Sequence, residues 1–282
     1  MTKKKYTDSY IERAKKYYAE GSFRMAASEF KRSADELCND DAMVYLGDMY
    51  LYGVGVEENY DTALHYFKEA IRIRNNGLAM CKIGDMYLLG KGVRRDVYEA
   101  FHWFEKALDE DEPEAMWRMG QKYNLFNLKF GIDENPKKAF DWYKKAADLG
   151  NAHAMESLGD LYNGYEDDIE HDEKKAFVMY YSASRLGNIN AQGKVGEMYY
   201  YGRGTDTDRD TGLILMIGAA PYSKFAQTKL YRLESDLWHK AKGGNSLARQ
   251  RLKELKTAYK VFAKDGNPFA EERLDNEDFQ YI

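Results

Sequence analysis

The chain has few cysteines, few prolines and no long apolar run. Its two cysteines, Cys38 and Cys81, are too few for a disulfide framework, and four prolines in 282 residues suit helices better than a loop-rich β protein. The longest apolar run, Leu213–Ala220, is far shorter than the roughly 20 residues that span a membrane. The first residues also lack an apolar signal segment. We therefore expect a cytoplasmic protein that does not contact membranes.

Positive charge is not in excess either. The formal net charge is −5 and the isoelectric point is about 5.7, which disfavours non-specific binding to nucleic acid. Charged residues make up 32% of the chain and hydrophobic residues 44%, a balance typical of a soluble chain that forms a core. We expect no nucleic-acid partner.

The sequence repeats itself every 36 to 39 residues. A glycine marks each copy, with an alanine five residues before it and a tyrosine three residues after it. These repeat glycines are Gly47, Gly84, Gly120, Gly159 and Gly196. A second block follows, in which small residues recur seven apart with aromatic residues between them, as in AFHWFEKA from Ala100. Each copy therefore predicts two short helices, A and B, which are stable when copies stack into a solenoid.

These columns resemble the Sel-1-like repeat family, which is related to tetratricopeptide repeats. The shared pattern is Ala-x-x-x-Leu-Gly-x-x-Tyr-x-x-Gly-x-Gly-Val, followed by Lys-Ala-x-x-Trp-Tyr-x-Lys-Ala-Ala-x-x-Gly. The segment AFDWYKKAADLGN at Ala139–Asn151 is the best match to the second half. The resemblance implies an all-α fold, a right-handed α/α superhelical solenoid of helix pairs.

The repeats divide the chain into three predicted regions. Residues 1–40 resemble a tetratricopeptide-like helix pair, and residues 225–282 are expected to form a helical cap or, alternatively, a docking element. Between them lie five repeats, of which the last is degenerate: 41–76, 77–112, 113–151, 152–188 and 189–224. The apolar segment 212–222 either self-associates or lies beneath the C-terminal helices, so the sequence leaves the oligomeric state open.

Glycine pairs spaced GxG follow helix A in three copies, as in LGDMYLYGVGV at Leu46–Val56. A dinucleotide site would need G-x-G-x-x-G after a strand, and a phosphate-binding P-loop would need a lysine and a hydroxyl residue after its glycines. Neither pattern occurs. Because glycine reaches positive φ without strain, we expect these glycines to end helix A and turn the chain. No cofactor is expected.

The sequence contains no recognisable catalytic or metal-binding constellation. The five histidines are scattered, and neither H-x-x-x-H nor C-x-x-C occurs. The acidic segment Glu166–Glu173 offers carboxylates to a divalent cation, but it lacks the glycine and the spacing of an EF-hand, so a solvated loop is the preferred interpretation. We expect a non-catalytic protein without a metal site, and a metal-assisted hydrolase is the disfavoured alternative.

Helical geometry divides helix A into two faces. At 100° per residue, positions −5, −4, −1 and +3 from the repeat glycine share one face, whereas positions −3, +1, +4 and +5 lie opposite. In tetratricopeptide-like solenoids the second face lines a concave groove, and the resemblance implies the same here. Val44 and Leu125 belong to these columns. The residues predicted to bind a partner are Asp48, Leu51, Tyr52, Asp85, Leu88, Leu89, Trp117, Gln121, Asp160, Glu197, Tyr200 and Tyr201.

Position +1 is acidic in four of the five copies, and apolar side chains flank it. This combination suits a partner peptide or helix with both apolar and Lys/Arg side chains. The alternative is that neighbouring or terminal helices cover these positions. We therefore predict a protein-interaction scaffold or adaptor. A second hypothesis is an immunity or inhibitor-type protein that neutralises one toxin or effector enzyme, as some proteins of similar sequence do.

Overall fold

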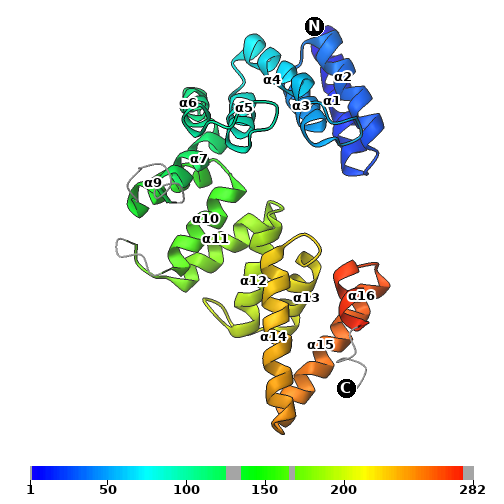
Figure 1. The fold of residues 1–282 in the computed structure, drawn as a ribbon, viewed down its shortest axis with the longest axis vertical. Helices are drawn as coiled ribbons and strands as arrows, with labels where there is room; N and C mark the ends of the chain where they lie inside the picture. The colour runs from blue at the N-terminus through cyan, green and yellow to red at the C-terminus, as the bar shows by residue number, and fades with distance from the viewer. Residues whose placement is uncertain (1, 125–134, 165–168, 276–282) are drawn as a thin grey trace. The chain divides into compact units, whose positions relative to one another are not determined.

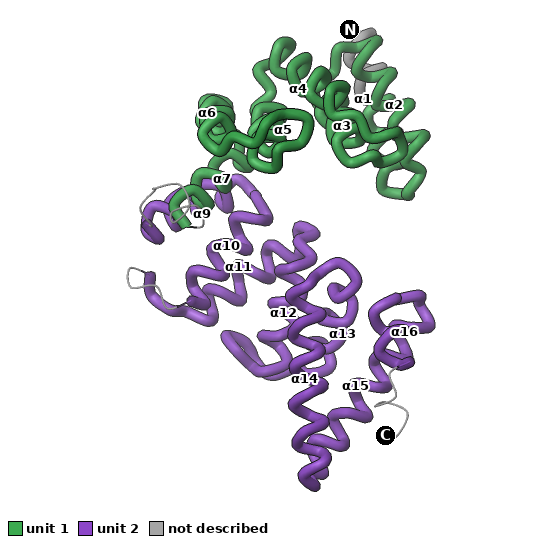
Figure 2. Tube along the Cα trace, in the orientation of Figure 1, with its two compact units in different colours: residues 1–134 green, residues 135–282 purple. Residues whose placement is uncertain are grey.

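A computed structural model describes residues 2–124, 135–164 and 169–275, with side chains from residue 9 onward. Within these ranges the chain forms helices joined by turns and contains no strand, which confirms the predicted all-α solenoid of helix pairs (Figure 1). The helices gather into two compact units, residues 1–134 and residues 135–282 (Figure 2). No helix among the described residues is both long enough and apolar enough to cross a membrane.

Compact unit 1 begins with one helix pair and continues through the first repeats. Each helix packs against its neighbours in the chain. Its helices are α1 (Thr2–Ala19), α2 (Phe23–Leu37), α3 (Asp40–Tyr52), α4 (Tyr60–Arg74), α5 (Gly77–Leu89), α6 (Val97–Leu108) and α7 (Pro113–Asn124).

Compact unit 2 contains the later repeats and three further helices at its C-terminal end. Its helices are α9 (Pro136–Asp148), α10 (Ala152–Asn163), α11 (Glu173–Arg185), α12 (Ile189–Tyr201), α13 (Arg209–Ala219), α14 (Lys224–Lys242), α15 (Ser246–Lys264) and α16 (Pro268–Leu274). In the repeats, α3, α5, α7, α10 and α12 are the A helices, and α4, α6, α9, α11 and α13 are the B helices.

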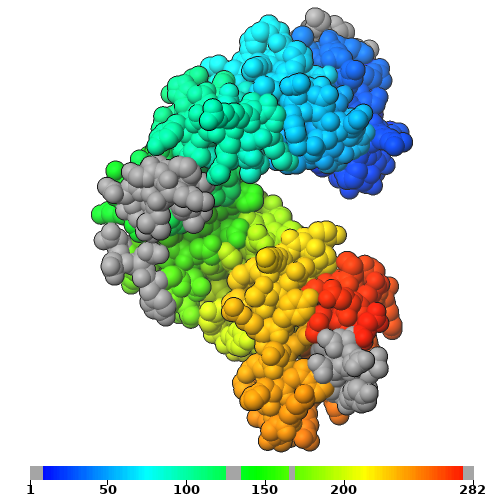
Figure 3. All heavy atoms as spheres, viewed as in Figure 1, coloured from blue at the N-terminus to red at the C-terminus, as the bar shows by residue number. Residues whose placement is uncertain are grey.

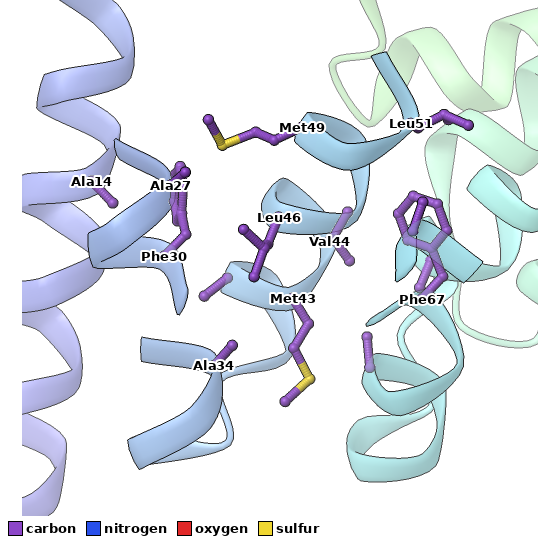
Figure 4. Packing of buried hydrophobic residues seen from close by; sticks show 14 of the residues in the cluster. Ala14, Ala27, Phe30, Ala34, Met43, Val44, Leu46, Met49, Leu51 and Phe67 are labelled. Atoms are coloured by element: carbon purple, nitrogen blue, oxygen red, sulfur yellow. The ribbon is translucent and has the colours of Figure 1, made fainter. Parts of the chain in front are cut away.

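The alanine and aromatic columns form the core of each repeat. The alanine five residues before the repeat glycine is fully buried in all five copies. Helix B contributes a buried aromatic ring in four copies: Phe67, Phe104, Tyr143 and Tyr180. In the first repeat, Leu46 and Met49 extend from α3 toward Phe30 of α2, whereas Phe67 lies on the α4 side of α3 (Figure 4). Apolar side chains thus cover helix A from both neighbours, which is why single repeats are unstable alone.

The repeat glycine allows helix A and helix B to approach closely. A Cβ atom built on Gly47 would lie 2.4 Å from the Cε1 atom of Phe67, and one on Gly84 would lie 2.4 Å from the Cε1 atom of Phe104. An ordinary carbon contact is about 3.5–4.0 Å, so no larger side chain fits. The aromatic ring of helix B therefore rests directly on the backbone of helix A.

The GxG pairs act as turns, as expected. Gly53, Gly90 and Gly202 each end an A helix in the left-handed conformation, with φ of 66°, 71° and 70°. The second glycine of each pair also has positive φ, and it lies against the start of the preceding B-type helix. A Cβ on Gly204, for example, would lie 2.1 Å from the carbonyl oxygen of Glu173. Both glycines are needed by the fold itself.

Asparagine or aspartate caps most of the repeat helices. The side chain of Asn39 accepts a hydrogen bond from the amide of Ala42 at 2.9 Å, and the same cap recurs at the start of α4, α5, α6, α9, α10, α11, α12 and α13. Such a cap satisfies an amide that has no partner within the helix. In α5 the cap residue Asn76 also donates to Asp40 of the previous helix A at 3.0 Å. The caps therefore fix both where helices begin and how successive repeats are aligned.

The sequence leaves open whether the apolar segment 212–222 self-associates or lies beneath the C-terminal helices. In the structure it lies beneath these helices. Leu213, Met216 and Ile217 of α13 share one buried cluster with residues of α14 and α15. The same cluster includes Phe269 and Ala270 of α16, whose atoms lie beside those of α15 (Figure 3). An ion pair between Arg273 and the buried carboxylate of Glu234 joins α16 to α14.

Candidate functional site

Helix A exposes a narrower strip than the sequence predicts. The position +5 side chains are open to solvent, with 51% of Tyr52, 61% of Leu89 and 55% of Tyr201 exposed. Each of these residues lies in the last turn of its helix, directly before the first glycine of a GxG turn. The strip is therefore marked by a large apolar or aromatic side chain at the same place in three repeats.

Positions −3 and +4 do not belong to this strip in the first and fifth repeats. Leu51 is 1% exposed and Tyr200 is 4% exposed, and Val44 is buried as well, so the prediction that these residues face a groove is wrong. Leu88 is half-buried. The reason is geometric: positions −3 and +4 lie about 40–60° from the repeat glycine, where α4 and α5 also pack on α3. Leu51 accordingly shares a core cluster with Ile83 and Met86 of α5.

The acidic residues at position +1 are not free. Asp48 and Asp85 are half-buried, Asp160 is exposed and Glu197 is buried. The carboxylates at Asp48, Asp85 and Asp160 each form an ion pair with a Lys or Arg of the next A helix, and Glu197 pairs with a lysine of α14. The pairs are Asp48–Lys82 at 2.8 Å, Asp85–Arg118 at 2.9 Å, Asp160–Lys194 at 2.6 Å and Glu197–Lys229 at 2.7 Å. The column thus forms an ion-pair ladder that joins neighbouring repeats.

Burial changes the pKa values of residues in the first two ion pairs, or rungs, of this ladder. Desolvation raises the pKa of Asp48 above its ordinary value, against the opposing effect of Lys82. Desolvation likewise raises the pKa of Asp85, against Arg118. Burial alone would lower the pKa of Lys82, but the Asp48 carboxylate raises it further, so the net direction is upward. These pairs lie where water screens them poorly, so each charge depends on its partner.

In compact unit 1, cations also stack on the aromatic residues of the predicted site. The guanidinium of Arg118 lies 4.3 Å from the ring of Trp117, and it donates to Gln121 at 3.0 Å. The ammonium of Lys91 lies 4.6 Å from the ring of Tyr52. Trp117 and Gln121 are half-buried. Lys91 is the middle residue of the GxG turn after α5, so the turn places a cation on the exposed tyrosine of the previous repeat.

In compact unit 2, each rung of the ladder involves additional residues. Lys194 bridges Asp160 and Glu156, and the hydroxyl of Tyr180 donates to Asp160 at 2.7 Å. The carboxylate of Glu197 binds Arg203, the middle residue of the next GxG turn, at 2.9 Å. Tyr201 packs edge-on against Tyr200 with ring centroids 5.0 Å apart.

Sequence reasoning missed the basic half of the ladder and the middle residue of the GxG turn. A signal for the first was present, because Lys82, Arg118 and Lys194 each lie two residues before a repeat glycine and 33 or 34 residues after the acid that they bind. No comparable signal marks the middle residues Lys91 and Arg203, because their contacts with Tyr52 and Glu197 form only when the chain folds.

The chemistry available in the described part of the chain is limited. There, no group of three or more His, Cys, Asp or Glu residues is arranged to hold a metal ion. Cys81 is buried, and desolvation raises the pKa of its thiol well above the ordinary value, so it is a poor nucleophile. Leu125 and residues 165–168, which include part of the acidic segment considered as a cation site, lie outside the described residues.

Comparison with known proteins identifies the repeats. The family model "Sel1 repeat" matches residues 40–73, 77–112, 113–151, 152–188 and 189–220. Among solved structures, the chain is similar to a Sel1 repeat protein from Oxalobacter formigenes, with 27% identity over 88% of this chain and 89% of that one and a TM-score of 0.57. It is also similar to a protective antigen with an SLR fold from uropathogenic Escherichia coli, with 25% identity, 95% and 63% coverage and a TM-score of 0.52.

A third solved structure, an immunity protein from Pseudomonas aeruginosa, is 19% identical over 66% of this chain and 71% of that one, with a TM-score of 0.49. The comparison with curated proteins finds no match. Proteins built from Sel1 repeats are generally protein-interaction scaffolds, and the fold is typically non-catalytic. Since five consecutive matches cover more than half of its length, the chain belongs to the Sel1 repeat family.

Proposed function

We propose that this protein is a non-catalytic scaffold that binds a partner protein through the exposed strip of its A helices. We name these positions the contact strip: Tyr52, Leu89 and Lys91 form its part on compact unit 1, and Tyr201 and Arg203 form a separate part on compact unit 2. The observation that carries the proposal is the exposure of a large apolar or aromatic side chain at position +5 in three repeats.

Repetition is what makes this exposure informative. Single exposed apolar side chains are common on protein surfaces and need no explanation. Here they recur at one helical position, and two of the three have charged neighbours: Tyr52 lies beside Lys91, and Tyr201 lies beside the Glu197–Arg203 ion pair. Tyrosine and arginine are also the residue types that contribute most often to binding energy at protein interfaces.

The proposal differs from the sequence-based hypothesis in the chemistry of the partner. Because Asp48 and Asp85 are already paired with Lys82 and Arg118, a basic partner would have to displace an internal cation to reach them. Displacing one would leave a half-buried charge without its partner, which is costly. The proposal therefore relies on the apolar anchors of the contact strip and not on a row of unpaired carboxylates.

A capture experiment with matched variants tests this function. The double variant Tyr52→Ala/Leu89→Ala removes two anchors without touching the buried core. Tyr98→Ala is the control, since Tyr98 lies on α6, a B helix of the same compact unit, and is 73% exposed. The immobilised proteins are incubated with lysate from the source organism, and bound proteins are quantified by mass spectrometry.

We expect proteins enriched by the wild type to be enriched equally by Tyr98→Ala and at least about tenfold less by the double variant, since losing an interface anchor typically costs more than 1 kcal/mol. Equal capture by all three proteins would refute the contact strip. A captured enzyme that loses activity on binding would make the protein an inhibitor, as the immunity-type hypothesis requires.

A further inference from the structure

A pocket with several charged lining residues lies at the contact strip in compact unit 2. It has a volume of about 500 Å³ and is formed by α12, the GxG turn after it, α13 and α14. Three cations, Arg203, Lys229 and Arg232, line it together with a single carboxylate, that of Glu197. The lining therefore carries a formal excess of two positive charges. In compact unit 1, by contrast, no rung has such an excess of cations: Asp48 pairs with Lys82, and Arg118 pairs with both Asp85 and Glu114.

Glu197 organises two of the three cations. It is only 9% exposed, and its two carboxylate oxygens are occupied separately, Oε1 by Lys229 at 2.7 Å and Oε2 by Arg203 at 2.9 Å. An ammonium has three donor hydrogens and a guanidinium has five, so each cation keeps donors that Glu197 does not use. Both side chains remain about one-third exposed, with 34% for Arg203 and 29% for Lys229, and can offer these donors to a ligand.

Arg232 supplies the charge that is not compensated. It lies three residues after Lys229 on α14, so the two side chains emerge from the same side of that helix. In the ranges that the structure describes, Arg232 forms no ion pair, hydrogen bond or stacking contact. Asp236, which lies one turn further along the helix, is engaged by Lys240 at 2.6 Å. Arg232 is thus an exposed arginine held at the edge of a pocket with no internal partner.

The apolar part of the pocket completes the site. Leu233 and Met216 are buried behind the cations, and the exposed ring of Tyr201 lies at the rim. The volume falls in the range typical of sites that hold an organic ligand and is larger than a bare phosphate needs. An anionic group on an apolar stem fits both parts of this lining.

From this arrangement we infer that the pocket binds a carboxylate side chain in an acidic segment of the partner protein, with Tyr201 packed against the stem of that side chain. Arginine matches the planar geometry of a carboxylate with two parallel hydrogen bonds, and lysine adds a third donor. This inference rests on the proposed function, because it names the chemistry of the partner at the compact unit 2 part of the contact strip.

Defined peptides test the inference on the full chain. The probe is acetyl-Glu-Tyr-Glu-Leu-Glu-amide, the neutral control replaces each Glu with Gln, and inorganic phosphate serves as a bare anion. Binding is followed by the backbone amide signals of Tyr201, Arg203 and Arg232 in NMR titrations. The protein variants are Arg232→Glu and, as a control with the same change of charge on an exposed arginine of α11, Arg185→Glu.

We expect saturable shifts at all three amides, with the Glu peptide binding at least about tenfold more tightly than the Gln peptide. Arg232→Glu should weaken binding by about tenfold, whereas Arg185→Glu should leave it within about twofold. Circular dichroism will show that both variants remain folded.

Equal affinity for the Glu and Gln peptides, or undiminished binding by Arg232→Glu, would overturn the inference. Phosphate that binds as tightly as the Glu peptide would overturn it too, because the pocket would then recognise a bare anion and not an acidic segment. These failures are separate from failure of the proposed function, which is judged by Tyr52 and Leu89 in compact unit 1. A scaffold whose capture depends on those anchors would stand even if this pocket does not bind the acidic peptide.

Discussion

The substitution Gly47→Ala should destabilise the protein, although alanine normally favours helices. Replacing glycine by alanine inside a helix stabilises it by about 1 kcal/mol. At Gly47, however, the new methyl carbon would lie 2.4 Å from the Cε1 atom of Phe67, whose ring is fully buried between α3 and α4. The ring cannot turn away without disturbing its neighbours, so helices A and B must separate.

The magnitude follows from these two opposing effects. Overpacking a dense core costs about 3 kcal/mol at the upper end of its usual range, and a contact this short belongs at that end. Subtracting about 1 kcal/mol for helix propensity leaves a net loss of about 2 kcal/mol in the free energy of unfolding. For a chain of this size, that loss corresponds to a fall of about 5 °C in the melting temperature.

Thermal unfolding followed by far-UV circular dichroism measures this effect. Gly218→Ala is the matched control, because Gly218 is also helical but has no atom nearer than 3.4 Å to the position of a Cβ. The control should melt at or slightly above the wild-type temperature. If Gly47→Ala melts at the wild-type temperature or above it, the steric explanation for the repeat glycine is wrong. Partial recovery in Gly47→Ala/Phe67→Leu would identify the ring as the obstacle.

Three further predictions follow from the turns, the ladder and the buried titratable groups. Gly204→Ala should lower the free energy of unfolding, measured by urea unfolding, by about 3 kcal/mol or more. The reason is that φ of Gly204 is +65° and that a Cβ would lie 2.1 Å from a backbone oxygen that cannot move aside. A loss below about 1 kcal/mol would contradict this. A double-mutant cycle with Asp48→Asn and Lys82→Met should give a coupling free energy of about 1–2 kcal/mol between the two side chains. This value exceeds that of surface ion pairs because the two side chains are only 29% and 23% exposed. Additive effects of the two single substitutions would argue against the ladder. Alkaline pH should destabilise the fold. Burial and Glu234 raise the pKa of Tyr259, and Asp48 raises that of Lys82 against the opposing effect of burial, so their contribution is complete below about pH 10 and is lost as the pH rises above it. The melting temperature should therefore fall as the pH rises above about 10, and less steeply in Tyr259→Phe; an unchanged temperature would contradict these shifts.

Much of the local architecture could be predicted from the sequence because it depends on neighbours along the chain. Helix length, the period of the apolar residues and the positive φ of Gly53, Gly90 and Gly202 are all properties of short segments. The exposure of Tyr52 and Leu89 also agrees with the sequence-based prediction. Among the positions expected to face the groove, +5 lies farthest from the repeat glycine, at about 140°.

The candidate site was harder to predict because its accessibility depends on contacts between repeats. On an ideal helix, Leu51 and Tyr200 lie on the same predicted groove face as Tyr52 and Tyr201, yet both are buried. A helix in a solenoid has several neighbours, and together they cover more of its circumference than a single partner would. Periodicity defines the direction of a side chain but not the angle over which other helices cover it.

The sequence by itself determined that this protein consists of stacked helix pairs, where those helices turn and which columns form the core. The tertiary structure decided which residues face solvent, which cation pairs with each acid of the +1 column, and why the repeat glycine must be glycine. The physical reason is the range of the interactions. Hydrogen bonds and hydrophobic periodicity act within a helix, whereas ion pairs such as Asp48–Lys82, and the ring of Phe67 on Gly47, exist only after separate helices have packed together.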